Sequence, residues 1–126
     1  MVAPHLHYKI TDNSSKPVLM IVHGLFGSLD NWQSLAKKWS ESFRVISVDV
    51  RNHGRSFHSD DMKFESLVND LHSIISHENV RKLYLLGHSM GGKTAMLFAV
   101  KYPKLERDSG SFTNVEAVLK IVLAVK

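Results

Sequence analysis

Residues 85–92 read LLGHSMGG, and this stretch decides the fold. The pattern G-x-S-x-G runs from Gly87 to Gly91. The segment before it, KLYLL at 82–86, is short and apolar, which predicts a buried strand. The segment after it, at 94–100, is apolar enough for a buried helix that ends before a proline. The sequence therefore predicts a strand, a tight turn and a helix, which is the context in which this pattern carries a reactive serine.

Ser89 lies between those glycines, and its surroundings indicate a nucleophile. Where a strand reverses into a helix within a few residues, flanking side chains clash, so the turn holds the serine in a strained conformation with its hydroxyl exposed. The helix N-terminus also directs free N–H groups and the positive end of its dipole at an oxyanion formed there. We expect Ser89 to be the nucleophile and the N–H of Met90 to be the first oxyanion donor. The alternative, a turn that only caps a helix, is disfavoured by this context.

The rest of the chain alternates strands with helices, which predicts a parallel sheet with right-handed crossovers. Apolar runs and helical spacing predict an edge strand at 5–10, a strand covered on both faces at 18–22, a helix at 28–39 with Ser28 as its N-cap, a strand at 43–50 and an amphipathic helix at 64–75.

The loop after the strand at 18–22 is expected to supply a second oxyanion donor. It reads HGLFGS from His23, and it lies beside the serine turn in such a sheet. Gly24 lets the loop turn back over the sheet edge, which exposes the N–H of Leu25 or of Phe26, and we favour Leu25. His23 is expected to be structural, with its ring fixing the loop.

Three stretches in this order resemble the α/β-hydrolase superfamily: HGLFGSLDNW at 23–32, DVRNHGRS at 49–56 and GHSMGGKTAM at 87–96. Within it they are most similar to small bacterial esterases and related animal abhydrolase-domain proteins, over about 18–103. The resemblance implies a mostly parallel sheet, a Ser, acid, His triad in that chain order, hydrolysis of carboxylic esters or acylglycerols, and no cofactor.

The resemblance also implies roles for single residues. Ser89 is the nucleophile, Leu25 and Met90 are the oxyanion donors, and Phe26 and His88 border a small ester or lipid substrate. His88 is expected to point toward the sheet side of the serine turn. The turn at 49–55 lies beside the pocket, and its polar residues Asp49, Arg51 and His53 are expected to clamp that turn rather than to act in the triad.

The chain departs from the family after Ser89. All eight histidines precede this serine, and the only carboxylates after it are Glu106, Asp108 and Glu116, none of which follows a predicted strand. In the family, both the acid and the base come later than the nucleophile. We therefore expect a truncated or splice-derived chain that lacks the triad acid and histidine. The alternative function is a catalytically inactive interaction module or acyl-binding module.

Residues 1–104 are expected to form the N-terminal part of an incomplete α/β-hydrolase domain with a sheet of about four strands. Residues 105–126 differ in character. Thr113 and Glu116 form a capping box, which predicts a lid-like helix from about Asn114, with a strand at 118–125 as the lesser alternative. Without a further strand, the strand at 82–86 would have an open edge, which predicts self-association.

Composition excludes several classes of function. The net charge of +4 arises from scattered Lys and Arg without a basic block, which argues against nucleic-acid binding. The chain has no cysteine, which excludes disulfides and thiolate metal sites, and no metal is expected. No apolar run is long enough for a transmembrane span, and no signal peptide is recognisable. We expect an intracellular protein, cytoplasmic or, by the family resemblance, mitochondrial.

Overall fold

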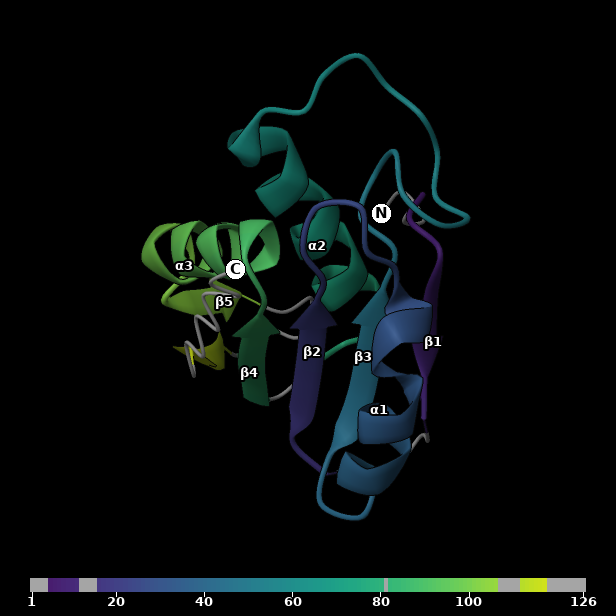
Figure 1. Ribbon diagram of the computed structural model, residues 1–126. Helices are drawn as coiled ribbons and strands as arrows, with labels where there is room; N and C mark the ends of the chain where they lie inside the picture. The colour runs from purple at the N-terminus through teal and green to yellow at the C-terminus, as the bar shows by residue number, and fades with distance from the viewer. Residues whose placement is uncertain (1–4, 12–15, 81, 107–111, 118–126) are drawn as a thin grey trace.

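The computed structural model of the chain describes residues 5–11, 16–80, 82–106 and 112–117 (Figure 1). Within them, six strands form one sheet in the order β1-β3-β2-β4-β6-β5. The strands are β1 (Tyr8–Ile10), β2 (Val18–Val22), β3 (Arg44–Val48), β4 (Lys82–Gly87), β5 (Lys104–Glu106) and β6 (Phe112–Ala117). The helices are the 3-10 helix η1 (Leu29–Trp32) and the α-helices α1 (Gln33–Trp39), α2 (Phe64–His77) and α3 (Met90–Lys101).

Four parallel strands, β3, β2, β4 and β6, make the centre of the sheet, and an antiparallel strand lies on each edge. β2 pairs with β3 on one side and β4 on the other, and all five of its residues are buried. The predicted cover on both faces is therefore confirmed. The register places Val22 opposite both Val48 and Gly87, so the carboxyl ends of these three strands meet at one edge of the sheet.

Helices cover both faces of this sheet. Figure 1 shows α1 on the near face over β3, with α2 and α3 on the far face. The larger core, on the side of α2 and α3, includes Met20, Ile46, Leu71, Ile74, Leu83, Leu85 and Phe98. The smaller core, on the side of α1, is formed by Leu19, Ile21, Ala36 and Val45. Because each buried large aliphatic side chain stabilises the fold by roughly 1.5–3 kcal/mol, these cores fix the strand ends that carry the loops.

The chain reverses its direction across the sheet between β2 and β4. From β2 it crosses to β3 on one side, and it then returns through α2 to place β4 on the other side of β2. The loops that follow β2 and β4 therefore run to opposite faces of the sheet, which opens a crevice at their carboxyl ends. The loop HGLFGS and the turn at Ser89 flank this crevice.

The helix predicted from Asn114 is wrong over residues 114–117, which belong to β6 and pair in parallel with β4. Phe112, Thr113 and Val115 are residue types that favour strands. Pairing with β4 also satisfies N–H and C=O groups that β4 would otherwise leave open, and this tertiary gain outweighs the local capping box. The remainder of the predicted helix, 118–126, lies outside the described residues.

The other predicted elements are confirmed, with small changes at their ends. The helix predicted at 28–39 begins with the 3-10 turn η1, and the Ser28 hydroxyl caps it by accepting the Asp30 N–H at 3.3 Å. The mostly parallel sheet is confirmed, but β6 and β5 extend it beyond the expected four strands. The expectation that β4 has an open edge, which was the basis for the predicted self-association, is therefore wrong. Among the described residues, no helix has the length and apolar character needed to cross a membrane.

Candidate active site

Ser89 joins β4 to α3 in a backbone conformation that few residues adopt. Its φ of 55° and ψ of −118° lie where a residue with a side chain is strained by about 1–3 kcal/mol. The N–H groups of Gly92 and Lys93 bond to the Ser89 carbonyl at 2.9 and 3.2 Å, so the backbone begins the helix. The side chain is exposed, and within the described chain its hydroxyl makes no hydrogen bond. The predicted strain is confirmed, and the hydroxyl is available to a ligand.

The glycines on either side of Ser89 are required by close backbone packing. A Cβ on Gly91 would stand 2.1 Å from the carbonyl oxygen of Val22 at the end of β2. A Cβ on Gly87 would stand 2.3 Å from the carbonyl oxygen of Gly91 itself. Both distances are far below van der Waals contact. The steric reason given above for the G-x-S-x-G pattern is therefore confirmed.

The loop after β2 lies directly against the serine turn. A Cβ on Gly24 would stand 3.1 Å from the Cβ of Ser89 and 3.0 Å from Nδ1 of His88. The His88 N–H also donates to the Val22 carbonyl at 3.0 Å, which joins the two strand ends. Phe26, two residues further on, has a φ of 64° and a side chain that is 91% exposed.

The N–H groups of this loop differ in whether they have partners. Phe26 N–H donates to Nε2 of His53 at 3.0 Å, and Gly27 N–H donates to the Gly24 carbonyl at 3.0 Å. In the described part of the chain, no hydrogen bond engages the N–H of Leu25 or that of Met90. These two donors, one on each side of the crevice, are the N–H groups that the sequence analysis selected.

His23 is buried and fixes the loop to the end of β3. Its Nε2 accepts the Val50 N–H at 3.0 Å, which requires that Nδ1 carry the proton and donate to the Gly24 carbonyl at 2.8 Å. Burial lowers the pKa of His23, an effect that the hydrogen bond to Gly24 opposes. The imidazole is thus neutral with both nitrogens bonded. The structural role predicted for it is confirmed.

Asp49 holds the turn after β3 against the loop after β2. Its Oδ1 accepts the Leu29 N–H at 2.8 Å and its Oδ2 accepts the Arg55 N–H at 3.0 Å. The Ser56 hydroxyl donates to the Asp49 carbonyl at 2.5 Å. Gly54 has a φ of 51°, and a Cβ there would stand 2.3 Å from the Asp49 carboxyl carbon. Asp49 is therefore occupied as a clamp, as predicted.

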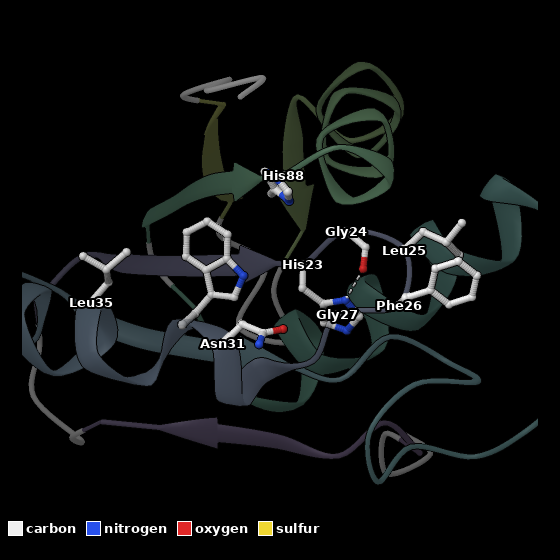
Figure 2. A pocket seen from close by; sticks show the side chains of 9 residues that line it. His23, Gly24, Leu25, Phe26, Gly27, Asn31, Leu35 and His88 are labelled. Carbon is white, nitrogen blue, oxygen red and sulfur yellow. Dashed lines mark hydrogen bonds between the residues drawn. The ribbon is translucent and has the colours of Figure 1, made fainter. Parts of the chain in front are cut away.

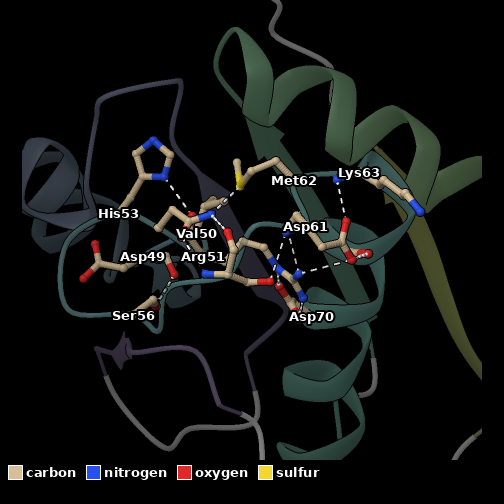
Figure 3. Close-up of polar contacts among 12 residues, drawn as sticks. Asp49, Val50, Arg51, His53, Ser56, Asp61, Met62, Lys63 and Asp70 are labelled. Carbon is tan, nitrogen blue, oxygen red and sulfur yellow. Dashed lines mark hydrogen bonds and ion pairs between the residues drawn. The ribbon is translucent and has the colours of Figure 1, made fainter.

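Arg51 extends this clamp to α2, as Figure 3 shows. Its Nε and Nη2 donate to the two carboxylate oxygens of Asp70 at 2.7 and 2.9 Å, and its Nη1 donates to the Asp61 carbonyl at 2.9 Å. The hydrogen bond to Asp70 raises the pKa of Arg51, with burial opposing it. The guanidinium also lies 4.9 Å from the ring centre of Phe57. The predicted clamping role of Arg51 is confirmed.

Two hollows flank the loop after β2. The first, about 360 Å³, lies on the α1 side and is lined by His23, Gly24, Leu25, Phe26, Gly27, Asn31, Trp32, Leu35 and His88 (Figure 2). The second, about 420 Å³, lies toward the turn after β3 and is lined by Leu25, Phe26, Gly27, Asn52, His53, Gly54 and Met62. Leu25 and Phe26 border both hollows. Ser89 is not among the lining residues of either one.

His88 is half-buried and faces the α1 side of the sheet, where its ring centre lies 5.9 Å from that of Trp32. Trp32, Leu35 and Met62 also line these hollows, although they were not predicted to do so. Trp32 and Leu35 are apolar positions at helical spacing in the helix predicted at 28–39. No signal in the sequence shows that these side chains also border a hollow, because that depends on how η1 and α1 meet the loop.

Residues 106 and 116, two of the three acidic positions after Ser89, lie in strands of the sheet and away from the serine turn. β5 is antiparallel to β6, and its last residue, Glu106, pairs with Phe112 at the amino end of β6. β6 runs parallel to β4, so Glu106 lies at the end of the sheet opposite the serine turn. Glu116 pairs with Tyr84 inside the strands rather than beyond their carboxyl ends. Asp108 lies outside the described residues. The expectation that these acidic residues follow no strand is wrong for Glu116, because β5 precedes it, and the backbone of residues 106 and 116 lies away from the serine turn.

The profile of the alpha/beta hydrolase fold family matches residues 17–107. Over 101 residues the chain is 44% identical to the sn-1-specific diacylglycerol lipase ABHD11 of Mus musculus, a match that covers 78% of this chain and 33% of that protein. Over 78 residues it is 41% identical to the esterase YbfF of Escherichia coli, covering 62% and 31%. A solved marine microorganism esterase superposes with a TM-score of 0.76 at 46% identity, covering 80% of this chain and 38% of that one.

The chain spans about a third of the length of the curated relatives that it matches. The matched region contains the loop after β2, the turn after β3 and the serine turn, which together form the site described above. The chain therefore belongs to the alpha/beta hydrolase fold family.

Proposed function

We propose that this chain carries the nucleophile and the oxyanion hole of a serine hydrolase that acts on carboxylic esters or acylglycerols. One observation carries the proposal: Ser89 is strained and exposed, and its hydroxyl has no bond within the described residues. Such strain persists where the surrounding structure imposes it, and it is characteristic of functional sites. The names of the relatives, an esterase and a diacylglycerol lipase, support an ester or lipid substrate.

In the proposed reaction, the Ser89 hydroxyl attacks the ester carbonyl carbon and its proton passes to a base. The carbonyl oxygen becomes an oxyanion, which the free N–H groups of Leu25 and Met90 bind. Collapse of this intermediate expels the alcohol, which takes up a proton, and leaves an acyl-serine that water hydrolyses. Each of the two donors matters for the rate, because removal of one oxyanion-hole donor typically lowers the rate about 10²–10³-fold.

We propose that Phe26 and His88 border the substrate. Both line the hollow on the α1 side of the loop, and Phe26 also lines the hollow toward Met62. The exposed Phe26 ring offers apolar surface to an acyl chain. No cofactor or metal takes part in the proposed reaction. The intracellular location and the lack of nucleic-acid binding stay predictions. Self-association also stays a prediction, without the open edge of β4 that suggested it.

None of the described residues is placed to act as the acid or the base toward Ser89. No histidine follows Ser89 in the 126 residues, and no described imidazole bonds to its hydroxyl. A serine without an adjacent imidazole is a weak nucleophile at neutral pH. We therefore propose that these 126 residues by themselves hydrolyse esters slowly at most.

The first test is covalent labelling of the purified chain by a fluorophosphonate probe, followed by intact mass. Stoichiometric labelling that is lost in Ser89→Ala and kept in the exposed-loop variant Ser42→Ala supports Ser89 as the nucleophile. Labelling that survives in Ser89→Ala contradicts this assignment. Circular dichroism of each variant shows whether a lost label reflects an unfolded chain.

A second test replaces the serine with a nucleophile that can react without a general base. The chain has no cysteine, so Ser89→Cys introduces a single thiol. Free N–H groups at a helix N-terminus lower the pKa of a thiol, and we expect iodoacetamide to alkylate position 89 about tenfold faster at pH 6.5 than it alkylates Ser42→Cys. Equal rates at the two positions would show that the serine turn does not stabilise an anion.

The alternative function is a catalytically inactive interaction module or acyl-binding module. The observation that favours it is the position of all eight histidines before Ser89. A folded chain that resists fluorophosphonate but binds a fluorescent fatty-acyl probe in the hollows lined by Phe26 would support this alternative. Loss of that binding in Phe26→Ala, but not in the exposed variant Val100→Ala, would place the ligand beside the loop.

A further inference from the structure

Two histidines connect the loop after β2 with the turn after β3 in the same way. His23 bonds to the Gly24 carbonyl in the loop and to the Val50 N–H in the turn. His53 bonds to the Phe26 N–H in the loop and to the Arg51 carbonyl in the turn, at 3.0 and 2.9 Å. The two ring centres are 5.1 Å apart. The loop is therefore held by a pair of imidazoles in contact with each other.

The bonding partners determine the tautomer of His53. A backbone N–H can only donate, so Nε2, which bonds to Phe26, must be the unprotonated acceptor. A carbonyl can only accept, so Nδ1 carries the proton that bonds to Arg51. The neutral ring thus uses both nitrogens. Neither is available to act as a base toward Ser89 in this conformation.

The bond from Phe26 has a consequence for its neighbour. Phe26 has a positive φ, which costs energy for a residue with a side chain, so an outside contact is needed to hold it. With Phe26 N–H directed to His53 and Gly27 N–H directed to Gly24, the N–H of Leu25 is left without a partner in the described residues.

We propose that His53 is a positioning residue for the oxyanion hole. By accepting the Phe26 N–H, it fixes the strained conformation of the loop and so directs the Leu25 N–H to the oxyanion that forms at Ser89. The proposal rests on the proposed function of Ser89 and Leu25, and it adds a residue from the turn after β3 to the machinery of that site.

The variants that test this proposal differ in which nitrogen of His53 they replace. The amide of His53→Gln reaches the place of Nε2 and can accept the Phe26 N–H. The amide of His53→Asn reaches only the place of Nδ1 and leaves the Phe26 N–H without an acceptor. His58→Asn is the matched control, because His58 is exposed and makes no hydrogen bond within the described chain.

The first readout is amide hydrogen exchange by NMR, which needs no activity. We expect His53→Asn to speed exchange at Phe26 at least tenfold, His53→Gln to restore most of the protection, and His58→Asn to change nothing. In the unaltered chain, the ¹⁵N–¹⁵N coupling across the hydrogen bond from Phe26 N to His53 Nε2 should be detectable. This coupling reports on the hydrogen bond even if a variant does not fold. If no coupling is detected, the proposal is overturned.

The second readout is the rate at which the fluorophosphonate probe labels Ser89. We expect a loss of about tenfold to a hundredfold in His53→Asn and recovery in His53→Gln, because a displaced donor costs less than a removed one. Unchanged labelling in a folded His53→Asn chain overturns the positioning role. If the unaltered chain is not labelled at all, the proposed function fails, and the exchange and coupling measurements still decide whether His53 holds the loop.

Discussion

Gly91 and Val22 pack so closely that a Cβ on Gly91 would stand 2.1 Å from the Val22 carbonyl oxygen. This contact brings the N-terminus of α3 against the end of β2, and so it sets the separation between Ser89 and the loop after β2. We expect Gly91→Ala to lower the free energy of unfolding by about 3 kcal/mol, because backbone on both sides cannot move far. Urea unfolding measures this difference.

The control for this substitution lies in the same helix. Val100 is 80% exposed, so Val100→Ala should change the free energy of unfolding by less than about 0.5 kcal/mol. A Gly91→Ala chain as stable as Val100→Ala would mean that the two strand ends are not held at this separation in solution.

Asp49→Asn tests the clamp between the turn after β3 and the loop after β2. One carboxylate oxygen accepts from Leu29 and the other from Arg55, and an amide can accept only one of these bonds. The amide would also place its own N–H against a backbone N–H. We expect a loss of about 1–3 kcal/mol in the free energy of unfolding. Asp60→Asn, at an exposed position, should have no measurable effect, and equal effects would contradict the clamp.

The elements around Ser89 could be predicted because their signals are local. The apolar run of β2, the spacing of α2 and the glycines around Ser89 each indicate a structure that neighbouring residues alone impose. The end of the chain could not be predicted in this way. Local capping favours a helix from Asn114, but pairing with β4 decides for a strand, and that pairing depends on a segment distant in the sequence.

In the candidate site too, local features could be predicted from the sequence and contacts between distant residues could not. The strain at Ser89 could be predicted, because two flanking glycines and a strand-to-helix turn require it. The bond from Phe26 to His53 could not, because it joins residues 27 positions apart and neither has a sequence signature for the other. The sequence indicated that His53 clamps its own turn. The structure adds that the same ring holds the loop which carries Leu25.

The pH dependence of stability should report on His23. Burial lowers its pKa in the folded chain below the ordinary value of about 6.5, so protons bind more readily to the unfolded chain. The stability that His23 contributes is fully present above pH 6.5. It is lost as the pH falls from there toward the pKa of His23 in the folded chain. Burial also lowers the pKa of His72, which adds to the loss with the same sign. We expect the urea midpoint to fall between pH 7.5 and pH 5.

His23→Gln separates this contribution from the rest. Gln cannot titrate, so the free energy of unfolding of this variant should fall less steeply over the same range, by at most about 1.4 kcal/mol per pH unit. His58→Gln, which removes an exposed histidine, should leave the slope as it is in the unaltered chain. An unchanged slope in His23→Gln would show that His23 does not carry the pH dependence.

The strain at Ser89 gives a prediction with an unusual sign. At an ordinary helical or extended position, glycine is less stable than alanine by about 0.4–1 kcal/mol, because glycine restricts the unfolded chain less. At φ 55° and ψ −118° alanine keeps the steric strain of serine, whereas glycine has no Cβ and relieves it. We therefore expect the free energy of unfolding of Ser89→Gly to be about 1 kcal/mol higher than that of Ser89→Ala.

The reference for this comparison is the exposed helical position Lys93, where Lys93→Gly should be less stable than Lys93→Ala. Opposite signs at positions 89 and 93, measured by urea unfolding in one buffer, would locate strain at the serine turn. The same sign at both positions would mean that Ser89 relaxes to an ordinary conformation in solution. The turn would then lose the feature that keeps its hydroxyl exposed at the end of β4, and with it the main structural support for a nucleophile.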